Sequence, residues 1–144
     1  MRRFLLDVNV LIALIDPAHV QHDRAHAWFA TKGHAAWATC PLTENGVLRI
    51  VGHLRYPTSP GSPAAVAELL SSLRNLPGHA FWPDDISLLD RKHANTTRLL
   101  DSAHVTDSYL LALAHAHKGQ LATFDQHMPA ESVVDGATAL HLIQ

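Results

Sequence analysis

Four carboxylates are the residues whose types and positions best suit chemistry, and they are Asp7, Glu44, Asp107 and Asp125. Asp7 directly follows the apolar run Phe4-Leu-Leu, and Asp125 directly follows Leu121-Ala-Thr-Phe. Such runs are typical of strands that are buried on both faces. Carboxylate oxygens select hard cations such as Mg²⁺ or Mn²⁺ over zinc. A cation held by these acids would activate a water molecule and stabilise the charge of a leaving oxygen.

Each acid taken alone has an ordinary structural explanation. Asp107 would be a helix N-cap, which stabilises a helix by about 0.5–2 kcal/mol relative to Ala. Glu44 would be a first-turn acid favoured by the helix dipole, and Asp7 and Asp125 would be polar residues that end buried strands. A cluster of all four is harder to explain, because two carboxylates ~4 Å apart repel by about 4 kcal/mol at an effective dielectric constant of 20. A divalent cation removes that repulsion.

Alternating strands and helices are the elements that would bring these acids together. We predict strands at residues 4–7, 35–40, 79–82, 121–124 and 139–143. We predict helices at residues 10–15, 22–31, 41 or 42 to about 54, 63–76, near 85–89, around 95–100, and 106 or 107 to 118. Asn9 is the expected N-cap of the first helix, and Gly119 is expected at the C′ position of the last. This alternation predicts an α/β fold with a central parallel sheet flanked by helices on both faces. Ligands bind such sheets at the carboxyl ends of the strands, where all four acids can converge.

Length and composition limit the class of protein. With 144 residues, the chain is expected to form one domain over residues 1–144 that buries about 68–70% of its unfolded surface. The net charge of −2 provides no broad electrostatic attraction for nucleic acid, although a metal site rich in acids would mask a locally basic rim. No apolar run predicts a membrane span, and Asp7 interrupts the run that would otherwise resemble a signal peptide. We therefore expect a protein of the cytoplasm.

Other residues that could form a site are better explained by structure. His22 and His26 have the i, i+4 spacing that a metal could use, but the chain has 12 histidines and no acid or cysteine completes the set, so we expect an exposed pair. Cys40 is the one cysteine, which excludes an intrachain disulfide and a multi-cysteine zinc site and suggests a reducing compartment. With no base nearby in sequence, Cys40 is expected to be a buried small side chain. The tryptophans are expected in the core, at positions Trp28, Trp37 and Trp82.

The residues around the four acids resemble the motifs of PIN-domain ribonucleases. Leu5-Leu-Asp-Val-Asn-Val-Leu-Ile12 resembles the opening motif, and Thr43-Glu44-Asn45 falls where that family has its second acid. Asp107-Ser-Tyr-Leu-Leu-Ala-Leu-Ala114 and Gly119-Gln-Leu-Ala-Thr-Phe-Asp125 resemble its closing pair. The resemblance covers nearly the whole chain, and the length is similar to that of the VapC-like toxins of type II toxin–antitoxin pairs. Residues 56–102 carry no motif of the family.

The resemblance implies a PIN-like three-layer fold and an endoribonuclease that hydrolyses RNA phosphodiester bonds with Mg²⁺ or Mn²⁺. It also implies that the chain is the toxin of a toxin–antitoxin pair. It implies a metal-binding and catalytic set made of Asp7, Glu44, Asp107 and Asp125. Asp7 and Asp107 are the best candidates for direct ligands, while Asp125 would act directly or through water. Asn9 and Thr123 are candidates for orienting those carboxylates, with an N-cap and an ordinary strand residue as the alternatives.

The implied partners are RNA, a cognate antitoxin protein and a second copy of the chain in a homodimer, with no membrane. The basic residues that could supply a phosphate-binding rim, or simply a solvated surface, are Arg49, Arg55, Arg91, Lys92 and Arg98. One alternative is a non-catalytic PIN-like module that binds RNA or protein. Another is a different α/β enzyme or a signalling receiver built on Asp7, which should carry a lysine at a later strand end. The candidate, Lys118, instead precedes its strand.

Overall fold

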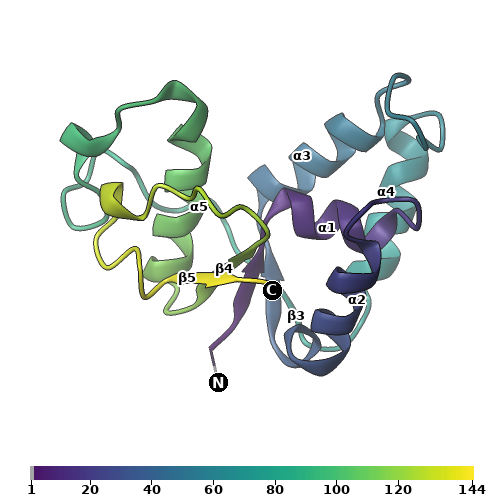
Figure 1. The fold of residues 1–144 in the computed structure, drawn as a ribbon, viewed down its shortest axis with the longest axis horizontal. Helices are drawn as coiled ribbons and strands as arrows, with labels where there is room; N and C mark the ends of the chain where they lie inside the picture. Colours follow the sequence, from purple (N-terminus) through teal and green to yellow (C-terminus); the bar gives the residue numbers. More distant parts are fainter. Residues whose placement is uncertain (1) are drawn as a thin grey trace.

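A five-stranded parallel sheet forms the centre of the computed structural model, which describes residues 2–144 (Figure 1). Its strands are β1 (Phe4–Leu6), β2 (Trp37–Thr39), β3 (His79–Phe81), β4 (Gln120–Thr123) and β5 (Leu140–Leu142). They lie in the order β3-β2-β1-β4-β5, and each neighbouring pair is parallel. In the register of the central strand, Leu5 lies beside Ala38 of β2 and Leu121 of β4. The carboxyl ends of β1 and β4 are therefore neighbours.

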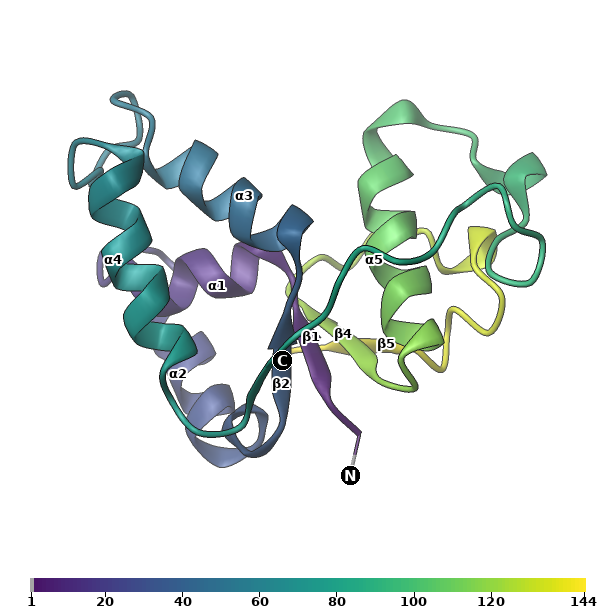
Figure 2. The same cartoon turned by 180° about the vertical axis from the view of Figure 1, so that it is seen from behind.

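Helices cover both faces of this sheet, as the sequence predicts (Figures 1 and 2). They are α1 (Val8–Ile15), α2 (His22–Thr31), α3 (Pro41–Val51), α4 (Pro63–Arg74) and α5 (Val105–Ala116). Helices α1 to α4 lie on one side and α5 lies on the other. The three-layer α/β fold is confirmed. No helix within residues 2–144 is both long enough and apolar enough to cross a membrane.

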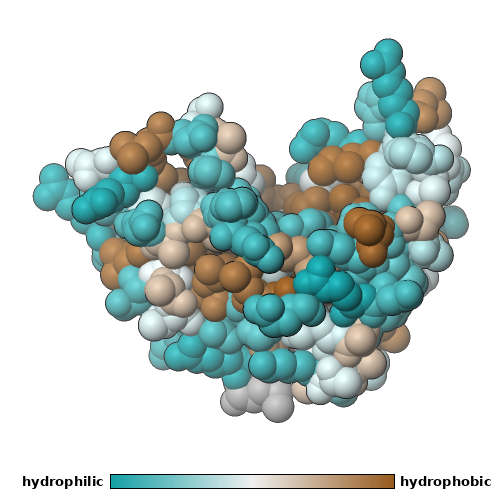
Figure 3. Space-filling view, viewed as in Figure 1, coloured by the Kyte–Doolittle hydropathy of each residue, from teal (hydrophilic) through white to brown (hydrophobic). Residues whose placement is uncertain are grey.

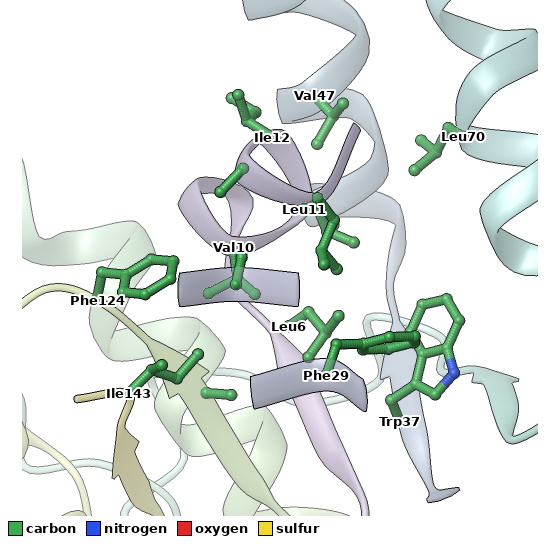
Figure 4. Packing of buried hydrophobic residues seen from close by; sticks show 14 of the residues in the cluster. Leu6, Val10, Leu11, Ile12, Phe29, Trp37, Val47, Leu70, Phe124 and Ile143 are labelled. Atoms are coloured by element: carbon green, nitrogen blue, oxygen red, sulfur yellow. The ribbon is translucent and has the colours of Figure 1, made fainter. Parts of the chain in front are cut away.

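Two hydrophobic cores, one on each face, hold the layers together. Phe4 and Leu6 of β1 point into the core shared with α1 to α4, and Leu5 between them points into the core shared with α5. Successive side chains of a strand face opposite sides, so an uninterrupted apolar strand suits burial on both faces. Figure 4 shows part of the first core, where Leu6 and Trp37 lie beneath Leu11 of α1. The expected core positions hold for Trp37 and Trp82, which are buried, while Trp28 is half-buried.

The ends of two helices differ from the sequence prediction. Asp7, and not Asn9, is the N-cap of α1, since its Oδ1 accepts a hydrogen bond from the Val8 N–H at 2.7 Å. Helix α5 begins at Val105, which places Asp107 in its first turn. The left-handed residue after α5 is Lys118, with φ of 59°, and not the following glycine. Asp7 thus directly follows the last residue of β1 and is also the N-cap of α1.

The segment around residues 85–89 was predicted to be helical and is a series of turns. The Ser87 hydroxyl accepts the Leu89 N–H at 3.1 Å, and the Asp90 carboxylate accepts the Lys92 N–H at 3.1 Å. Such local side-chain bonds offer the backbone an alternative to helical hydrogen bonds, which is why Ser and Asp disfavour helix interiors. A short 3₁₀ turn at Thr96–Arg98 replaces the helix expected around 95–100.

His26 is exposed, as expected, whereas His22 is half-buried, and both are hydrogen-bonded to the end of α1. Nδ1 of His22 donates to the carbonyl of Ala13 at 2.7 Å, and Nε2 of His26 donates to the carbonyl of Leu14 at 2.9 Å. The last carbonyls of a helix lack partners within it, so two imidazoles from α2 satisfy them here. The i, i+4 spacing therefore serves helix capping.

Candidate active site

A pocket of about 440 Å³ lies at the carboxyl edge of the sheet, between α3 and α5. Its lining includes Asp7, Asp107, Thr106, Asn45 and Arg49. In Figure 1 helices α3 and α5 rise from this edge on opposite sides, and Figure 3 shows the notch that they leave, with apolar surface inside it. The lining of this pocket thus includes two acids, Asp7 and Asp107, and one cationic side chain, Arg49.

Asp7 is the most constrained acid of this pocket. Its side chain is buried, with one oxygen accepting the Val8 N–H and the other accepting the Thr123 hydroxyl at 2.7 Å. Burial, together with smaller contributions from the charges of Asp107 and Asp125, raises the pKa of Asp7 to about 6 against the lowering effect of these two hydrogen bonds. The ionised form of Asp7 is therefore costly in this environment unless a positive charge lies nearby.

Asp107 and Asp125 complete a group of three acids. Asp107 is half-buried in the first turn of α5, and burial together with the charge of Asp125 raises its pKa, while His104 acts in the opposite direction. Asp125 follows β4, and its Oδ1 accepts the His127 N–H at 2.8 Å. The tertiary structure thus brings together three of the four acids that the sequence selected, close enough for Asp107 and Asp125 to disfavour ionisation of Asp7.

Thr123 connects two of these acids through a single hydroxyl group. Its Oγ1 donates to Asp7 and accepts both the Asp125 N–H at 3.1 Å and the Asn9 side-chain N–H at 3.3 Å. The hydroxyl is fully buried, so water does not compete for these bonds. The other polar atom of the Asn9 side chain, Oδ1, is buried and has no hydrogen-bond partner within residues 2–144.

Glu44, the fourth acid, lies apart from the other three in this structure. Its Oε2 accepts the Thr39 hydroxyl at 2.6 Å and lies 3.2 Å from Nη1 of Arg74. Thr39 in turn accepts a hydrogen bond from Nε2 of His79 at 2.7 Å. The sequence prediction placed Glu44 correctly in the first part of α3, but it did not anticipate Arg74 of α4, whose guanidinium is the nearest positive charge.

The three acids that do converge fit a hard divalent cation. All their donor atoms are oxygens, the chemistry that Mg²⁺ and Mn²⁺ prefer. The raised pKa values show that their mutual repulsion and burial are uncompensated by the residues present. Among residues 2–144, no three His, Cys, Asp or Glu side chains stand close enough together to hold a metal as they are. A cation held by all three would require their carboxylates to move closer together, and its charge would offset their mutual repulsion.

Asn45 and Arg49 also line the pocket; the sequence analysis proposed Arg49 for a phosphate-binding rim but did not select Asn45. They are one turn apart on α3, and both line the pocket with Asp7 and Asp107. Their i, i+4 spacing directly after Glu44 puts them on one helix face, which is the feature that could have identified them. Glu44 itself projects from a different face, toward α4.

Comparisons with known proteins agree with this geometry. The PIN domain family matches residues 4–130. Ribonuclease VapC44 of Mycobacterium tuberculosis is 47% identical over 140 residues, which are 97% of each chain. Ribonuclease VapC39 of the same organism is 41% identical over 121 residues, covering 84% of this chain and 87% of that protein.

Solved structures show the same fold at low sequence identity. The crystal structure of Mycobacterium tuberculosis VapC20, described as a sarcin-ricin loop cleaving toxin, superposes with a TM-score of 0.64 at 13% identity, covering 92% of this chain and 97% of that one. FitAcB from Neisseria gonorrhoeae gives a TM-score of 0.55 at 20% identity, covering 85% and 87%. The family match over residues 4–130 and the 47% identity to ribonuclease VapC44 agree with the parallel sheet and its three acids. The chain therefore belongs to the PIN-domain family and is a VapC-type member of it.

Proposed function

We propose that this chain is a metal-dependent endoribonuclease that hydrolyses phosphodiester bonds of RNA and acts as the toxin of a toxin–antitoxin pair. The observation that carries the proposal is the convergence of Asp7, Asp107 and Asp125 at the carboxyl edge of the sheet, where the charges of Asp107 and Asp125 raise the pKa of Asp7, and that of Asp125 raises the pKa of Asp107. The 47% identity to a protein named ribonuclease VapC44 supports RNA as the substrate.

Asp7 and Asp107 are proposed to bind Mg²⁺ or Mn²⁺ directly, and Asp125 directly or through water. Such a cation, when bound, lowers the pKa of a water molecule and offsets negative charge on the leaving oxygen. Both oxygens of Asp7 already accept one hydrogen bond each, and a carboxylate oxygen has a second lone pair for a cation. Thr123 and Asn9 are proposed to hold the carboxylates in orientation, a task in which such partners are worth about 10–100-fold in affinity or activity.

Arg49 is proposed to contact a phosphate of the RNA strand. It is the basic residue that lines the pocket of Asp7 and Asp107, and its side chain is exposed on α3. Asn45, one turn earlier, would donate to a phosphate or ribose oxygen beside it. Contacts of this kind position a nucleic-acid strand without reading its sequence. The other basic residues proposed from the sequence, such as Arg55 and Arg91, do not line this pocket.

Glu44 is proposed as the fourth carboxylate of the catalytic set. Its use there requires its side chain to leave Arg74 and Thr39, with which it now pairs. The Glu44 side chain is only 15% exposed, so its carboxylate is largely shielded from solvent. Separating it from Arg74 would therefore cost free energy unless another cation takes the place of the guanidinium.

An antitoxin protein and a second copy of the chain are the proposed protein partners. The pocket walls carry large apolar side chains that remain exposed, with Leu42 at 39% and Ile50 at 36% on α3. Val105, at the start of α5, is 43% exposed. Exposed apolar side chains gathered at one cleft are typical of surfaces that bind other proteins. A structure described as VapBC2 from Rickettsia felis, bound to promoter DNA, has the same fold with a TM-score of 0.55 at 11% identity.

RNA cleavage by the purified chain tests the proposed function. We expect total RNA to be cut with Mg²⁺ or Mn²⁺ and left intact with a chelator, with mapped 5′ ends defining the cut positions. Asp7→Asn and Asp107→Asn should each abolish cleavage, while Asp23→Asn, which changes an exposed acid of α2, should cut like wild type. Full activity of either site variant would refute the assignment. Binding of RNA without cleavage by the wild type would favour the non-catalytic module instead.

A further inference from the structure

A second pocket is lined in part by chain neighbours of Asp107 and Asp125. It has a volume of about 230 Å³, and its lining includes Arg98, Leu100, His104, His127 and Glu131. Ser108, which follows Asp107 on α5, also lines it. His127 belongs to the turn that donates a backbone N–H to Asp125. A strand of RNA whose phosphate lies at the acids would therefore have a neighbouring nucleotide at this pocket.

Hydrogen bonds fix the walls of this second pocket. The buried hydroxyl of Ser108 lies 2.8 Å from that of Ser132, which donates to the Pro129 carbonyl at 2.8 Å. Because Ser132 uses its proton there, Ser108 is the donor of the first bond. The Asn95 N–H donates to the Ser132 carbonyl at 2.9 Å. Helix α5 and the segments 95–101 and 127–132 are thus tied together, and a preformed pocket loses less entropy on binding.

Two opposite charges face this pocket without partners of their own. Within residues 2–144, neither the guanidinium of Arg98 nor the carboxylate of Glu131 forms a side-chain hydrogen bond or ion pair, although both line the pocket. The rest of the lining includes Leu100, Met128, the imidazoles of His104 and His127, and Asp101, whose Oδ2 lies 3.9 Å from Nδ1 of His104. Flat apolar surface with a few polar groups is typical of a pocket for a planar ligand.

The size and the charges of the pocket select one class of ligand. Pockets for drug-sized ligands hold about 300–1,000 Å³, so this smaller one suits a single ring system. Guanine is the base that presents two donors, N1–H and N2–H, to one carboxylate and two acceptors, O6 and N7, to one guanidinium. Bases of single-stranded RNA are recognised on these edges while they stack on imidazole or apolar side chains.

We propose that the pocket lined by Arg98, His104, His127 and Glu131 receives a guanine base adjacent to the phosphodiester bond that is cut. The inference rests on the proposed nuclease function and adds a sequence preference to it. Glu131 accepts from the Watson–Crick edge of the guanine, and Arg98 donates to its O6 and N7.

Cleavage of short RNAs that differ at one base tests this proposal. We expect the wild type to cut oligonucleotides with guanine beside the scissile bond faster than those with adenine, and inosine, which lacks the N2 amino group, to lie between them. Glu131→Gln and Arg98→Gln should each lower the ratio of kcat/KM for guanine over adenine by about tenfold, since a bidentate contact is worth about 1–3 kcal/mol of discrimination. Matched controls are Glu68→Gln and Arg55→Gln, which change exposed side chains far from this pocket in sequence and should keep the ratio.

The possible results separate this inference from the proposed function. If the wild type cuts no RNA with Mg²⁺ or Mn²⁺, the proposed function fails. If it cuts RNA without a guanine preference, or if the variants slow all substrates by the same factor, the base pocket is refuted and the nuclease stands. Variants that leave the preference intact but weaken binding of an antitoxin would also refute it, by identifying the pocket as a protein contact.

Discussion

The hydroxyl of Thr123 donates to Oδ2 of Asp7 at 2.7 Å, although 116 residues separate the two in the chain. The pairing of β1 with β4 brings them together, since Leu6 lies beside Ala122 in the parallel register. The same oxygen atom of Thr123 accepts the backbone N–H of Asp125 at 3.1 Å. One buried hydroxyl therefore sets the positions of the two acids that end the central strands.

Thr123→Val should uncouple these two acids while preserving the shape of β4. It removes the hydrogen bond that lowers the pKa of Asp7 and the acceptor of the Asp125 N–H. We expect Mn²⁺ affinity or kcat to fall about 10–100-fold, the range for partners that orient metal ligands. Thr123→Ser keeps the hydroxyl and should restore most of the loss. Equal defects in the two variants would show that the methyl group and not the hydroxyl matters.

Asp7→Asn should stabilise the protein in chelator even though it abolishes cleavage. Burial raises the pKa of Asp7 to about 6 in the folded chain, against 3.8 ordinarily, so the unfolded chain ionises first as the pH rises. The free energy of unfolding therefore falls between about pH 4 and pH 6. Above that range it stays lower by roughly 3 kcal/mol. We expect a higher Tm for Asp7→Asn at pH 7.5, measured by thermal unfolding. A lower Tm would mean that Asp7 stabilises the fold through its cap to Val8.

Mn²⁺ should raise the Tm of the wild type by binding the folded chain alone. A free concentration 100 times the dissociation constant stabilises by about 2.7 kcal/mol, which corresponds to roughly 5–10 °C for a chain of this size. Asp107→Asn should reduce this shift, because it removes a proposed ligand from the cluster. An equal shift in wild type and variant would place the metal elsewhere. Calorimetric titration with Mn²⁺ provides an independent measure.

Glu44→Gln and Arg74→Gln distinguish a catalytic from a structural role for Glu44. If Glu44 serves the metal, Glu44→Gln lowers the rate strongly, while Arg74→Gln leaves the carboxylate free and retains activity. If the pair is structural, either change leaves a half-shielded charge without its partner and lowers the Tm with little effect on the rate per folded molecule. Rate and Tm measured on the same preparations decide between the two.

Tyr56→Phe should weaken the fold most clearly at neutral pH. The buried Asp16 accepts hydrogen bonds from the hydroxyls of Tyr56 and Thr58. Burial acts to raise the pKa of Asp16, but these bonds and that from the Ala18 N–H hold it below its ordinary value of 3.8. The stabilisation is therefore present above about pH 4 and is lost as the pH falls through the folded-state pKa. The difference in Tm between wild type and Tyr56→Phe should shrink in acid, and a constant difference would contradict this account.

The sequence predicted most elements because their local patterns are strong. Helix α2 has the predicted bounds of residues 22–31, and Pro41 and Pro63 begin α3 and α4 as helix-initiating prolines should. The region 85–100 was mispredicted, because the side chains of Ser87 and Asp90 accept backbone N–H groups and so favour turns over a helix. Hydrophobic periodicity does not reveal such bonds.

The sequence by itself determined which acids end strands or begin helices, and hence predicted that Asp7, Glu44, Asp107 and Asp125 lie at one edge of a parallel sheet. That conclusion needs only hydrophobic pattern and topology, which are properties of chain segments. Tertiary structure alone decided that Thr123 bridges two of the acids, that Glu44 pairs with Arg74, and that Arg98 and Glu131 share a pocket. These relationships join residues from different elements, and they depend on strand register and side-chain rotamers, which become defined only when the layers pack.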